Sequence, residues 1–424
     1  RTEMIWLADL RSVVQNTMSS TTDAVSWSKL YTAIDQANAV LKYAPAVAMT
    51  DTKRSWAIGQ AAFARAYLYF WAVRLWGDVP LNLNPIESVA QPEAYPSRAP
   101  KASVYAQIGT DIDLAVKNAG SLGTDKYLAT ADAVNMLKAE YALWMYAVQN
   151  GGDNYLTMAG EALDAVTRTP LLGKFADVFD VKNKANKEIA FALHVDATNE
   201  VHSASYIQRF IWGSTQVKAS YRNVEGGVPV SSNQWFCYAD EFIGELKRNK
   251  EQNNDQRSDV TYMERTGVSD MYEKVGWPNK FTGDWSSGTL LYDDDLILYR
   301  YAQYYMFRAE LYYYRKQYKE ALGELNVVAQ RAYGKADFYT SATQQDVLEA
   351  LAAENRWEFA EEGNLWFTYI RLGYIDTYCP LKYWPNTGVE GGVGGSTNPN
   401  IYLFPISTSA INKNSNLRQT EGWS

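Results

Sequence analysis

The sequence predicts a mainly α-helical fold of stacked helix pairs, with a loop-rich variable region and a few short strands. The first observation is Ala61–Leu81, which begins as a helix that is apolar on nearly every side. Such a helix is stable only between other helices. It ends at Gly77 and Pro80, which stop a helix. The second observation is that residues 174–293 are instead rich in Gly, Asn, Ser, Thr and Trp.

Helical periodicity recurs on both sides of this segment. Leu30, Ile34 and Leu41 share one face of a first helix, which a polar connector at 50–53 separates from the apolar one. A proline-punctuated loop is expected at 81–100. Further helices are expected at 103–116, 130–149, 155–167 and 347–370, with a turn at 151–154.

A helix pair around residue 315 has the spacing of a tetratricopeptide-like repeat. Ala309 and Ala321 are small residues 12 positions apart, where such a repeat brings its two helices into contact. Leu325 and Val328 supply the next apolar contacts of the second helix. An ordinary αα-hairpin shows much of the same pattern and stays open as an alternative.

The expected organisation is a single domain over residues 1–424. A tetratricopeptide-like helical scaffold is expected over 21–170 and 295–370, and a loop-rich region over 174–293. Within that region Glu188–Val195 reads as a strand. Long loops in a compact protein are usually functional. Residues 371–424 are expected to form a C-terminal loop, glycine-rich at 387–396, and a closing strand at 402–406.

Composition narrows the classes of function. The formal net charge of −8 and the absence of a basic run argue against nucleic acid as a partner. No apolar window is long enough to span a bilayer. Cys237 and Cys379 are too few for a disulfide framework and read as two ordinary thiols. The first residue is Arg1 rather than Met, as expected of a processed or trimmed form.

The sequence predicts no catalytic residue, metal or cofactor. His194 and His202 are the only histidines, and the motifs G-x-S-x-G, H-E-x-x-H and C-x-x-C are all missing. The acidic runs Asp293–Asp295 and Asn253–Asp255 read as solvated turns. Paired carboxylates for glycoside hydrolysis stay open, because they are defined by their distance in space.

Ligand binding is better supported, because the chain holds 14 Trp and 31 Tyr. Pyranose rings pack a face of C–H bonds on aromatic rings, while their hydroxyls need polar partners at the rim. Trp277 and Trp285 lie outside any helical or strand stripe, although tryptophans are mostly buried. The candidate ligand-binding residues in these loops are Trp277, Trp285, Tyr272, Asp284, Trp212, Asn223 and Trp235.

Several stretches, in order, closely resemble the SusD/RagB family of nutrient-binding outer-membrane lipoproteins. Ala61–Leu81 is similar to its "A-x-x-RA…GDVPL" signature, and Tyr402–Trp423 to its closing "Y-L-F-P-I-P…QNPGY". Five further stretches resemble family motifs: Trp27–Asn38 lies before these two, and Ser103–Ala115, Asn186–Phe191, Glu241–Arg257 and Arg300–Asn326 lie between them. Departures include Glu354–Glu358 with Asn364–Trp366, which lacks the usual acid, and Ser407 in place of proline.

This resemblance implies a non-catalytic, glycan-binding lid on the extracellular face of the outer membrane. It implies delivery of ligand to a SusC-like TonB-dependent transporter, and an N-terminal lipid anchor that is not present in this chain. A peptide-binding member of the family is the first alternative. A glycoside hydrolase and a pure protein-interaction scaffold are alternatives from other classes.

Overall fold

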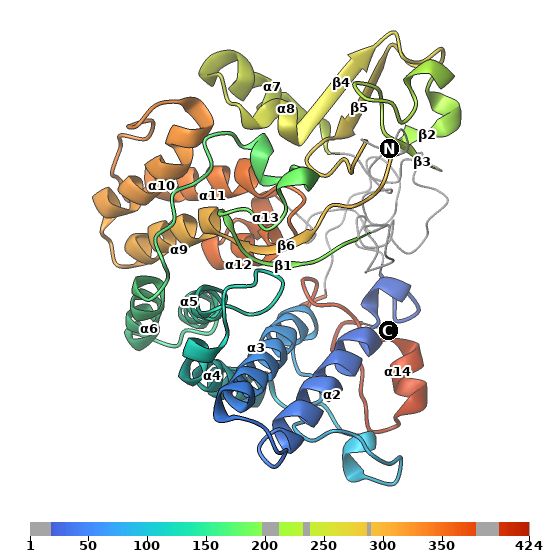
Figure 1. Cartoon of the computed structure of the whole chain (residues 1–424), viewed down its shortest axis with the longest axis vertical. Helices are drawn as coiled ribbons and strands as arrows, with labels where there is room; N and C mark the ends of the chain where they lie inside the picture. The colour runs from blue at the N-terminus through green and yellow to red at the C-terminus, as the bar shows by residue number, and fades with distance from the viewer. Residues whose placement is uncertain (1–17, 197–211, 232–237, 286–289, 379–397, 424) are drawn as a thin grey trace. The chain divides into compact units, whose positions relative to one another are not determined.

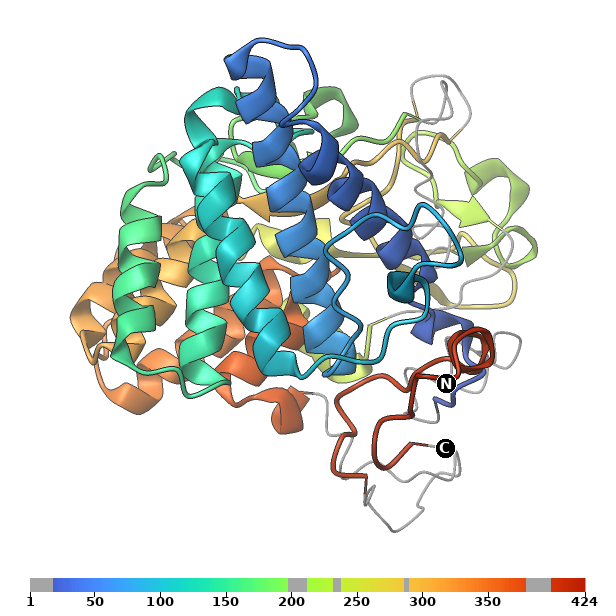
Figure 2. The ribbon, with the colours of Figure 1, turned by 90° about the horizontal axis from the view of Figure 1, so that it is seen from below.

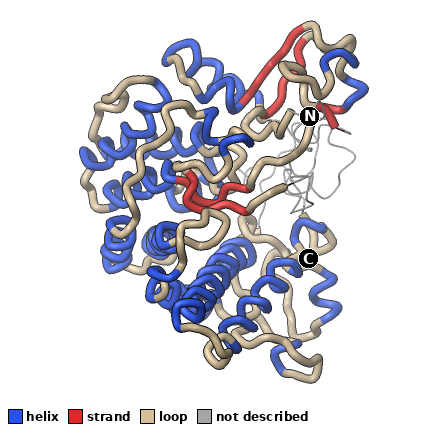
Figure 3. The backbone as a smooth tube through the Cα atoms, viewed as in Figure 1, coloured by secondary structure: helices blue, strands red, loops and turns tan. Residues whose placement is uncertain are grey.

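The computed structural model describes residues 18–196, 212–231, 238–285, 290–378 and 398–423, and these are mainly helical (Figures 1 and 3). The expectations for Cys237, Cys379, His202, Trp235 and the glycine-rich loop at 387–396 lie outside these residues. The chain forms two compact units. One holds residues up to 162 together with those from 369 onward, and the other holds residues 163–368.

The first unit is built on antiparallel helices. Its longest helix is α3 (Asp51–Trp76), which starts earlier than predicted because Thr50 caps it: the Thr50 hydroxyl accepts from Lys53 N–H at 3.3 Å. Gly77 ends it at φ 73°. Figure 2 shows α2 and α4 on either side of α3. The other helices are α2 (Ser28–Tyr43), α4 (Lys101–Lys117), α5 (Ala131–Ala147), α6 (Asp153–Asp164), α13 (Ile375–Tyr378) and α14 (Thr408–Lys413). The last two residues of α6 already belong to the second unit, and a further helix, α12 (Leu365–Leu372), also crosses the boundary between the units.

Buried ion pairs join these helices. Arg65 of α3 holds Asp111 of α4 through two hydrogen bonds and donates to the Asn38 amide oxygen of α2 at 2.9 Å. Nine residues further along α3, Arg74 donates to Glu140 of α5 at 2.6 Å. Asn38, Arg65 and Asp111 all belong to the motifs noted in the sequence, so those motifs mark the interior of the helix stack.

The predicted closing strand at 402–406 is wrong. These residues form a turn and an extended segment with no partner strand among the described residues. The backbone of Ile406 pairs instead with a side chain: its N–H donates to Gln419 Oε1 at 2.7 Å and its carbonyl accepts from Gln419 Nε2 at 2.9 Å. Phe404 N–H donates to Leu75 O at 2.6 Å. The side-chain amide of Gln419 therefore makes the hydrogen bonds that a neighbouring strand would make.

The C-terminal segment also binds the beginning of the chain. Thr408 N–H donates to Ser20 O at 2.7 Å, and the Asn414 amide donates to Pro96 O at 2.7 Å. Arg98 donates to Arg418 O at 3.1 Å. These contacts hold the proline-punctuated loop at 81–100, which contains only the short helix η3 (Pro92–Ala94), against residues 414–418.

The second unit combines a helical part with a loop-rich part that carries short strands. β6 (Leu296–Arg300) pairs antiparallel with β1 (Ile189–Leu193), as the predicted strand requires, and runs directly into α9 (Tyr301–Tyr314). The helices α10 (Tyr318–Tyr333) and α11 (Gln344–Glu358) pack on α9. Two more helices, α7 (Asp240–Asn253) and α8 (Arg257–Thr261), occupy part of the region predicted to be loops. The remaining strands are β2 (Trp212–Gly213), β3 (Val230–Ser231), β4 (Tyr262–Thr266) and β5 (Lys274–Pro278).

Arg300, at the junction of β6 and α9, is fully buried among three carboxylates. Its Nη1 lies 3.0 Å from Glu188 Oε1 and 2.6 Å from Glu358 Oε1, and its Nε lies 2.7 Å from Glu362 Oε2. These partners come from the residue before β1, the end of α11 and the turn after it. A buried cation needs such partners because its desolvation is costly.

Arg257 extends this buried network toward α8. It forms ion pairs with Asp255 at 2.9 Å and with Glu354 at 2.7 Å, and approaches Glu358 at 3.4 Å. The expectation that Asn253–Asp255 is a solvated turn is wrong for Asp255, which is 3% exposed. The ion pair with Arg257 compensates for the burial of the Asp255 carboxylate.

The predicted fold class, a helical-pair scaffold with a loop-rich region and few strands, is confirmed. The small residues Ala309 and Ala321, whose spacing indicated a helix pair, are both fully buried in α9 and α10. Within the described residues, no helix combines the length and the apolar character needed to cross a membrane.

Candidate functional site

The loop-rich part of the second unit is built on a small hydrophobic core of its own. Two strand pairs supply most of it: β2 with β3 in parallel, and β4 with β5 antiparallel. The core residues are Trp212, Val217, Val228, Val230, Val268, Val275 and Trp277, with Met263 and Tyr272 packed against them. The candidate loops are therefore held by packed side chains rather than by backbone alone.

Trp277 and Trp212 are interior residues of this core. Trp277 is 2% exposed and lies on β5, where its indole N–H donates to Asn279 Oδ1 at 2.9 Å. Trp212 is 5% exposed and donates to Gly276 O at 2.6 Å. The expectation that Trp277 lies outside a strand stripe is wrong, because Val275 and Trp277 alternate inward on either side of Gly276. A ring buried in this way cannot stack on a ligand.

Tyr272 and Asn223 lie at the edge of the same core. The half-buried ring of Tyr272 meets Trp212 edge-on with 5.0 Å between ring centroids, and its hydroxyl accepts from Gln216 at 3.4 Å. Asn223, at φ 48°, closes the loop that precedes β3. Its amide accepts from Val230 N–H at 2.8 Å and donates to Val230 O at 3.1 Å. The side-chain amide of Asn223 thus stabilises its own loop through hydrogen bonds to the Val230 backbone.

Asp284 and Trp285 are half-buried and lie at the start of a narrow hairpin. Asp284 and Leu291 exchange two backbone hydrogen bonds, of 2.7 and 2.9 Å. Tyr292, the next residue, donates through its hydroxyl to Val230 O at 3.4 Å. This bond brings the hairpin beside β3 and hence beside the core that holds Trp212 and Tyr272.

The structure adds three surface residues that the sequence interpretation missed. Met271, which adjoins Tyr272 in the β4–β5 connection, is 66% exposed. Tyr221 and Val224, in the loop closed by Asn223, are 38% and 43% exposed. Met271 lies between two short strands that the sequence analysis did not predict, at the tip of a hairpin where side chains meet solvent.

A buried lysine anchors this part to the helices of the same unit. Lys280 Nζ, two residues beyond β5, donates to the carbonyls of Glu358 and Ala360 at 2.9 and 2.7 Å and pairs with Glu362 at 3.0 Å. These acceptors belong to the end of α11 and the turn after it. We call the described loop-rich residues 212–231, 238–285 and 290–292 the platform. Through Lys280 the platform is joined to the buried ion network around Arg300.

A histidine and a buried carboxylate lie side by side just after β1 and just before β6. His194 Nδ1 lies 3.1 Å from Asp295 Oδ1, which also accepts from Val195 N–H at 2.9 Å. The expectation that Asp293–Asp295 is a solvated turn is wrong for Asp294 and Asp295, which are 3% and 8% exposed. No group of three or more His, Cys, Asp or Glu side chains in the described parts of the chain is arranged to hold a metal ion.

Comparisons with known proteins agree with this architecture. The SusD-like protein P38 of Formosa agariphila is 23% identical over 388 residues, which are 86% of this chain and 75% of that protein. The starch-binding protein SusD of Bacteroides thetaiotaomicron is 30% identical over 161 residues, which are 37% of this chain and 27% of that protein.

Solved structures share the fold. A SusD superfamily protein from Bacteroides vulgatus superposes with a TM-score of 0.76 at 24% identity, over 98% of this chain and 90% of that one. A laminarin binding SusD-like protein gives a TM-score of 0.75 at 20% identity, over 98% and 90% of the two chains. The surface glycan-binding protein A of Bacteroides uniformis gives 0.77 at 18% identity, over 99% and 89%.

Two family models match the sequence itself. The SusD family model matches residues 208–423, slightly more than half of the 424 residues. A second model, described as starch-binding and associating with the outer membrane, matches residues 4–133. Together they cover both the helical stack and the loop-rich platform, and the chain belongs to the SusD family.

Proposed function

We propose that this protein is a non-catalytic glycan-binding protein of the cell surface, which captures an oligo- or polysaccharide and delivers it to a SusC-like TonB-dependent transporter. The observation that carries the proposal is the platform formed by residues 212–231, 238–285 and 290–292. It presents half-buried aromatic rings and polar groups on loops that their own core and Lys280 hold in place. Preorganised loops bind with less loss of conformational entropy.

The proposed contacts are Trp285, Tyr272 and Asp284, which are all half-buried and reach the surface. An aromatic ring offers an apolar face to the C–H groups of a pyranose, while the Asp284 carboxylate accepts from its hydroxyls. Trp212 and Trp277 support this surface from below. Asn223 shapes its loop. Trp235 stays a predicted contact outside the described residues.

The ligand class is supported by the names of relatives. Laminarin binding, surface glycan binding and starch binding are named for three proteins that share the fold or part of the sequence. The family description associated with residues 4–133 names the outer membrane. We extend this to a lipoprotein on the extracellular face, anchored through an N-terminal lipid.

Affinity electrophoresis against a panel of polysaccharides tests the binding. We expect at least one glycan to retard the native protein, and Trp285→Ala to reduce that retardation several-fold. The matched control is Trp56→Ala, since Trp56 is a 40% exposed tryptophan on α3, in the first unit. This control should migrate like the unmodified chain in every gel.

Three other results would each point elsewhere. Retardation by no glycan, together with saturable binding of peptides, would favour a peptide-binding member of the family. Release of reducing sugar from a retarding glycan would indicate a hydrolase. Failure of a SusC-like barrel to copurify with the tagged protein from detergent-solubilised outer membranes would remove the transporter from the proposal.

A further inference from the structure

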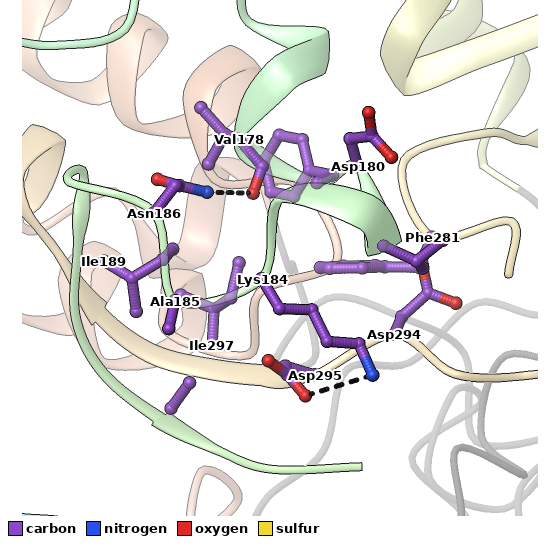
Figure 4. A pocket seen from close by; sticks show the side chains of 13 residues that line it. Val178, Asp180, Lys184, Ala185, Asn186, Ile189, Phe281, Asp294, Asp295 and Ile297 are labelled. Atoms are coloured by element: carbon purple, nitrogen blue, oxygen red, sulfur yellow. Dashed lines mark hydrogen bonds and ion pairs between the residues drawn. The ribbon is translucent and has the colours of Figure 1, made fainter. Parts of the chain in front are cut away.

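A pocket lies beside the platform, within the second unit (Figure 4). It is a partly open hollow, and the space of about 320 Å³ between its walls includes open solvent, so its enclosed part is much smaller. Figure 4 shows Phe281 and Asp294 on one side of it and Ile189 on the other. Apolar groups form most of its wall: Val178, Phe179, Val181, Ile189, Phe281 and Ile297. Only a narrow, mainly apolar group can enter such a space.

The buried polar groups of the wall are occupied, with one exception. Lys184 Nζ bonds to Val195 O at 2.6 Å and to Asp293 at 2.7 Å. The Asn186 amide donates to Val178 O at 3.0 Å. Asp294 is 3% exposed, and its Oδ2 atom has no hydrogen-bond partner in the described structure. One residue of the pocket wall, Asp294, therefore has a buried carboxyl oxygen without a hydrogen-bond partner.

The single unpaired oxygen of Asp294 limits which chemical group of a ligand can bind to it. A primary ammonium would bring three N–H donors and leave two of them unpaired, which is costly in a buried site. A divalent cation needs four or more ligands. A hydroxyl has a single O–H donor, which Asp294 Oδ2 can accept, so no donor is left unpaired. A methylene that carries this hydroxyl would meet the rings of Phe281 and Phe179.

We propose that this pocket is a subsite for the hydroxymethyl arm of a neutral hexose unit, with its O–H donating to Asp294 Oδ2 and its methylene packed against Phe281. The proposal rests on the glycan-binding function argued above and specifies which sugars it favours. Hexopyranoses that carry a free primary hydroxyl are preferred over the pentopyranoses that lack this arm.

The position of the subsite fits the proposed ligand contacts. Phe281 lines the pocket, and Asp284 and Trp285 follow it closely in the sequence, in the same loop. The backbone N–H of Gly283, between them, faces the Asp294 carboxyl. Burial raises the pKa of Asp294 to about 7, and Lys184 opposes the shift. Both forms of the carboxyl can bond a hydroxyl, and the ionised form is the stronger acceptor.

Matched sugar pairs test the subsite directly. The probes are the methyl pyranosides of glucose and xylose, galactose and L-arabinose, and mannose and lyxose, which differ within each pair only by the hydroxymethyl arm. Saturation-transfer NMR titrations measure their binding to the full chain. In at least one pair the hexoside should bind about ten-fold more tightly, with the strongest saturation at its C6 protons.

Three variants separate the subsite from a general effect on folding. Asp294→Leu, which has no oxygen, should abolish the preference, and Asp294→Asn, which keeps an acceptor of similar shape, should retain part of it. Ala192→Val adds two methyl groups to the pocket wall and should also abolish it. Asp177→Asn alters an exposed acid that lies outside the pocket wall and should leave the preference unchanged.

The outcomes distinguish this inference from the proposed function. Equal binding within every pair, or a preference that survives both Asp294→Leu and Ala192→Val, would overturn the subsite even where a polysaccharide retards the protein. Loss of the preference with an unchanged thermal unfolding midpoint would support it. Retardation by no polysaccharide would overturn the glycan-binding function itself.

Discussion

The guanidinium of Arg65 meets both carboxylate oxygens of Asp111, with 2.8 Å from Nε to Oδ2 and 2.6 Å from Nη2 to Oδ1. The two residues belong to α3 and α4, and both are buried. A bidentate pair fixes the rotation of both helices about their axes as well as their separation. The pair therefore sets the register of the helical stack in the first unit.

Breaking this pair should be far more costly than breaking a surface pair on the same helix. We expect Asp111→Leu to lower the free energy of unfolding by about 3–5 kcal/mol, because Arg65 then stays buried without a counter-charge. Asp113→Asn, which removes an exposed partner of Lys138, should cost less than about 1 kcal/mol. Denaturant titrations of both variants measure the difference, and equal losses would refute the assigned role.

The central acid of the second unit should make stability sensitive to acid. Burial opposes ionisation of Glu358, but Arg331, Arg300 and Arg257 hold its pKa well below the ordinary value of 4.5. Its contribution is complete above about pH 4.5 and is lost as the pH falls toward the folded-state value. Glu358→Gln should therefore unfold more readily at pH 7 and lose less stability on acidification. Unfolding midpoints between pH 3 and 7 provide the test.

Asp294 should act with the opposite sign. Its pKa is raised from 3.8 to about 7, chiefly by burial, so between these values the folded chain holds a proton that the unfolded chain has released. Raising the pH through this window lowers the free energy of unfolding, and no further change follows above it. The gain in stability from Asp294→Asn should grow from near zero at pH 4 to a plateau above pH 7. A gain that is constant with pH would contradict this.

Two glycines with the same backbone conformation offer a matched test of the platform. Gly283 and Gly267 have φ of 75° and 74°. A Cβ at Gly283 would clash with the backbone oxygen of Leu291, whereas nothing lies within 4 Å of one at Gly267. Gly267→Ala should cost about 1 kcal/mol from strain alone. Gly283→Ala should cost more and weaken glycan binding, as thermal unfolding and gel retardation would show.

The two tryptophans that the sequence treats alike should separate on mutation. Trp277→Ala opens a cavity in the platform core and should lower the free energy of unfolding by about 3–5 kcal/mol. Trp285→Ala removes a half-buried ring from a hairpin and should lower glycan affinity with a smaller loss of stability. Calorimetric unfolding and affinity electrophoresis on the same samples make the comparison, and a reversed pattern would exchange their roles.

The sequence predicts the helical scaffold because helix periodicity is local. The amphipathic faces of α2 and α4 and the stop at Gly77 depend on neighbours within a few residues. The motifs that indicate the family are equally visible, but their physical role is not. Arg257 and Glu354 are ion-pair partners 97 residues apart, and nothing in their spacing announces that contact.

The candidate site is predicted less well for the same reason. Whether Trp277 faces inward depends on the pairing of β4 with β5, and a shift of one residue would reverse it. The alternation of Val275 and Trp277 around Gly276 is a local sign of that strand. Burial of Asp294 has no such sign, because the groups that cover it come from distant segments, as Lys184 does.

The contacts of the C-terminal segment have a consequence for the order of folding. Thr408 and Ser20 are bonded across 388 residues, and Asn414 and Pro96 across 318. Such distant closures are slow to form, and during synthesis they must wait for the last residues. The second unit, continuous in sequence, can fold first. The N-terminal helices of the first unit then reach their final structure last, once the C-terminal residues have been synthesised and bind the loop at 81–100.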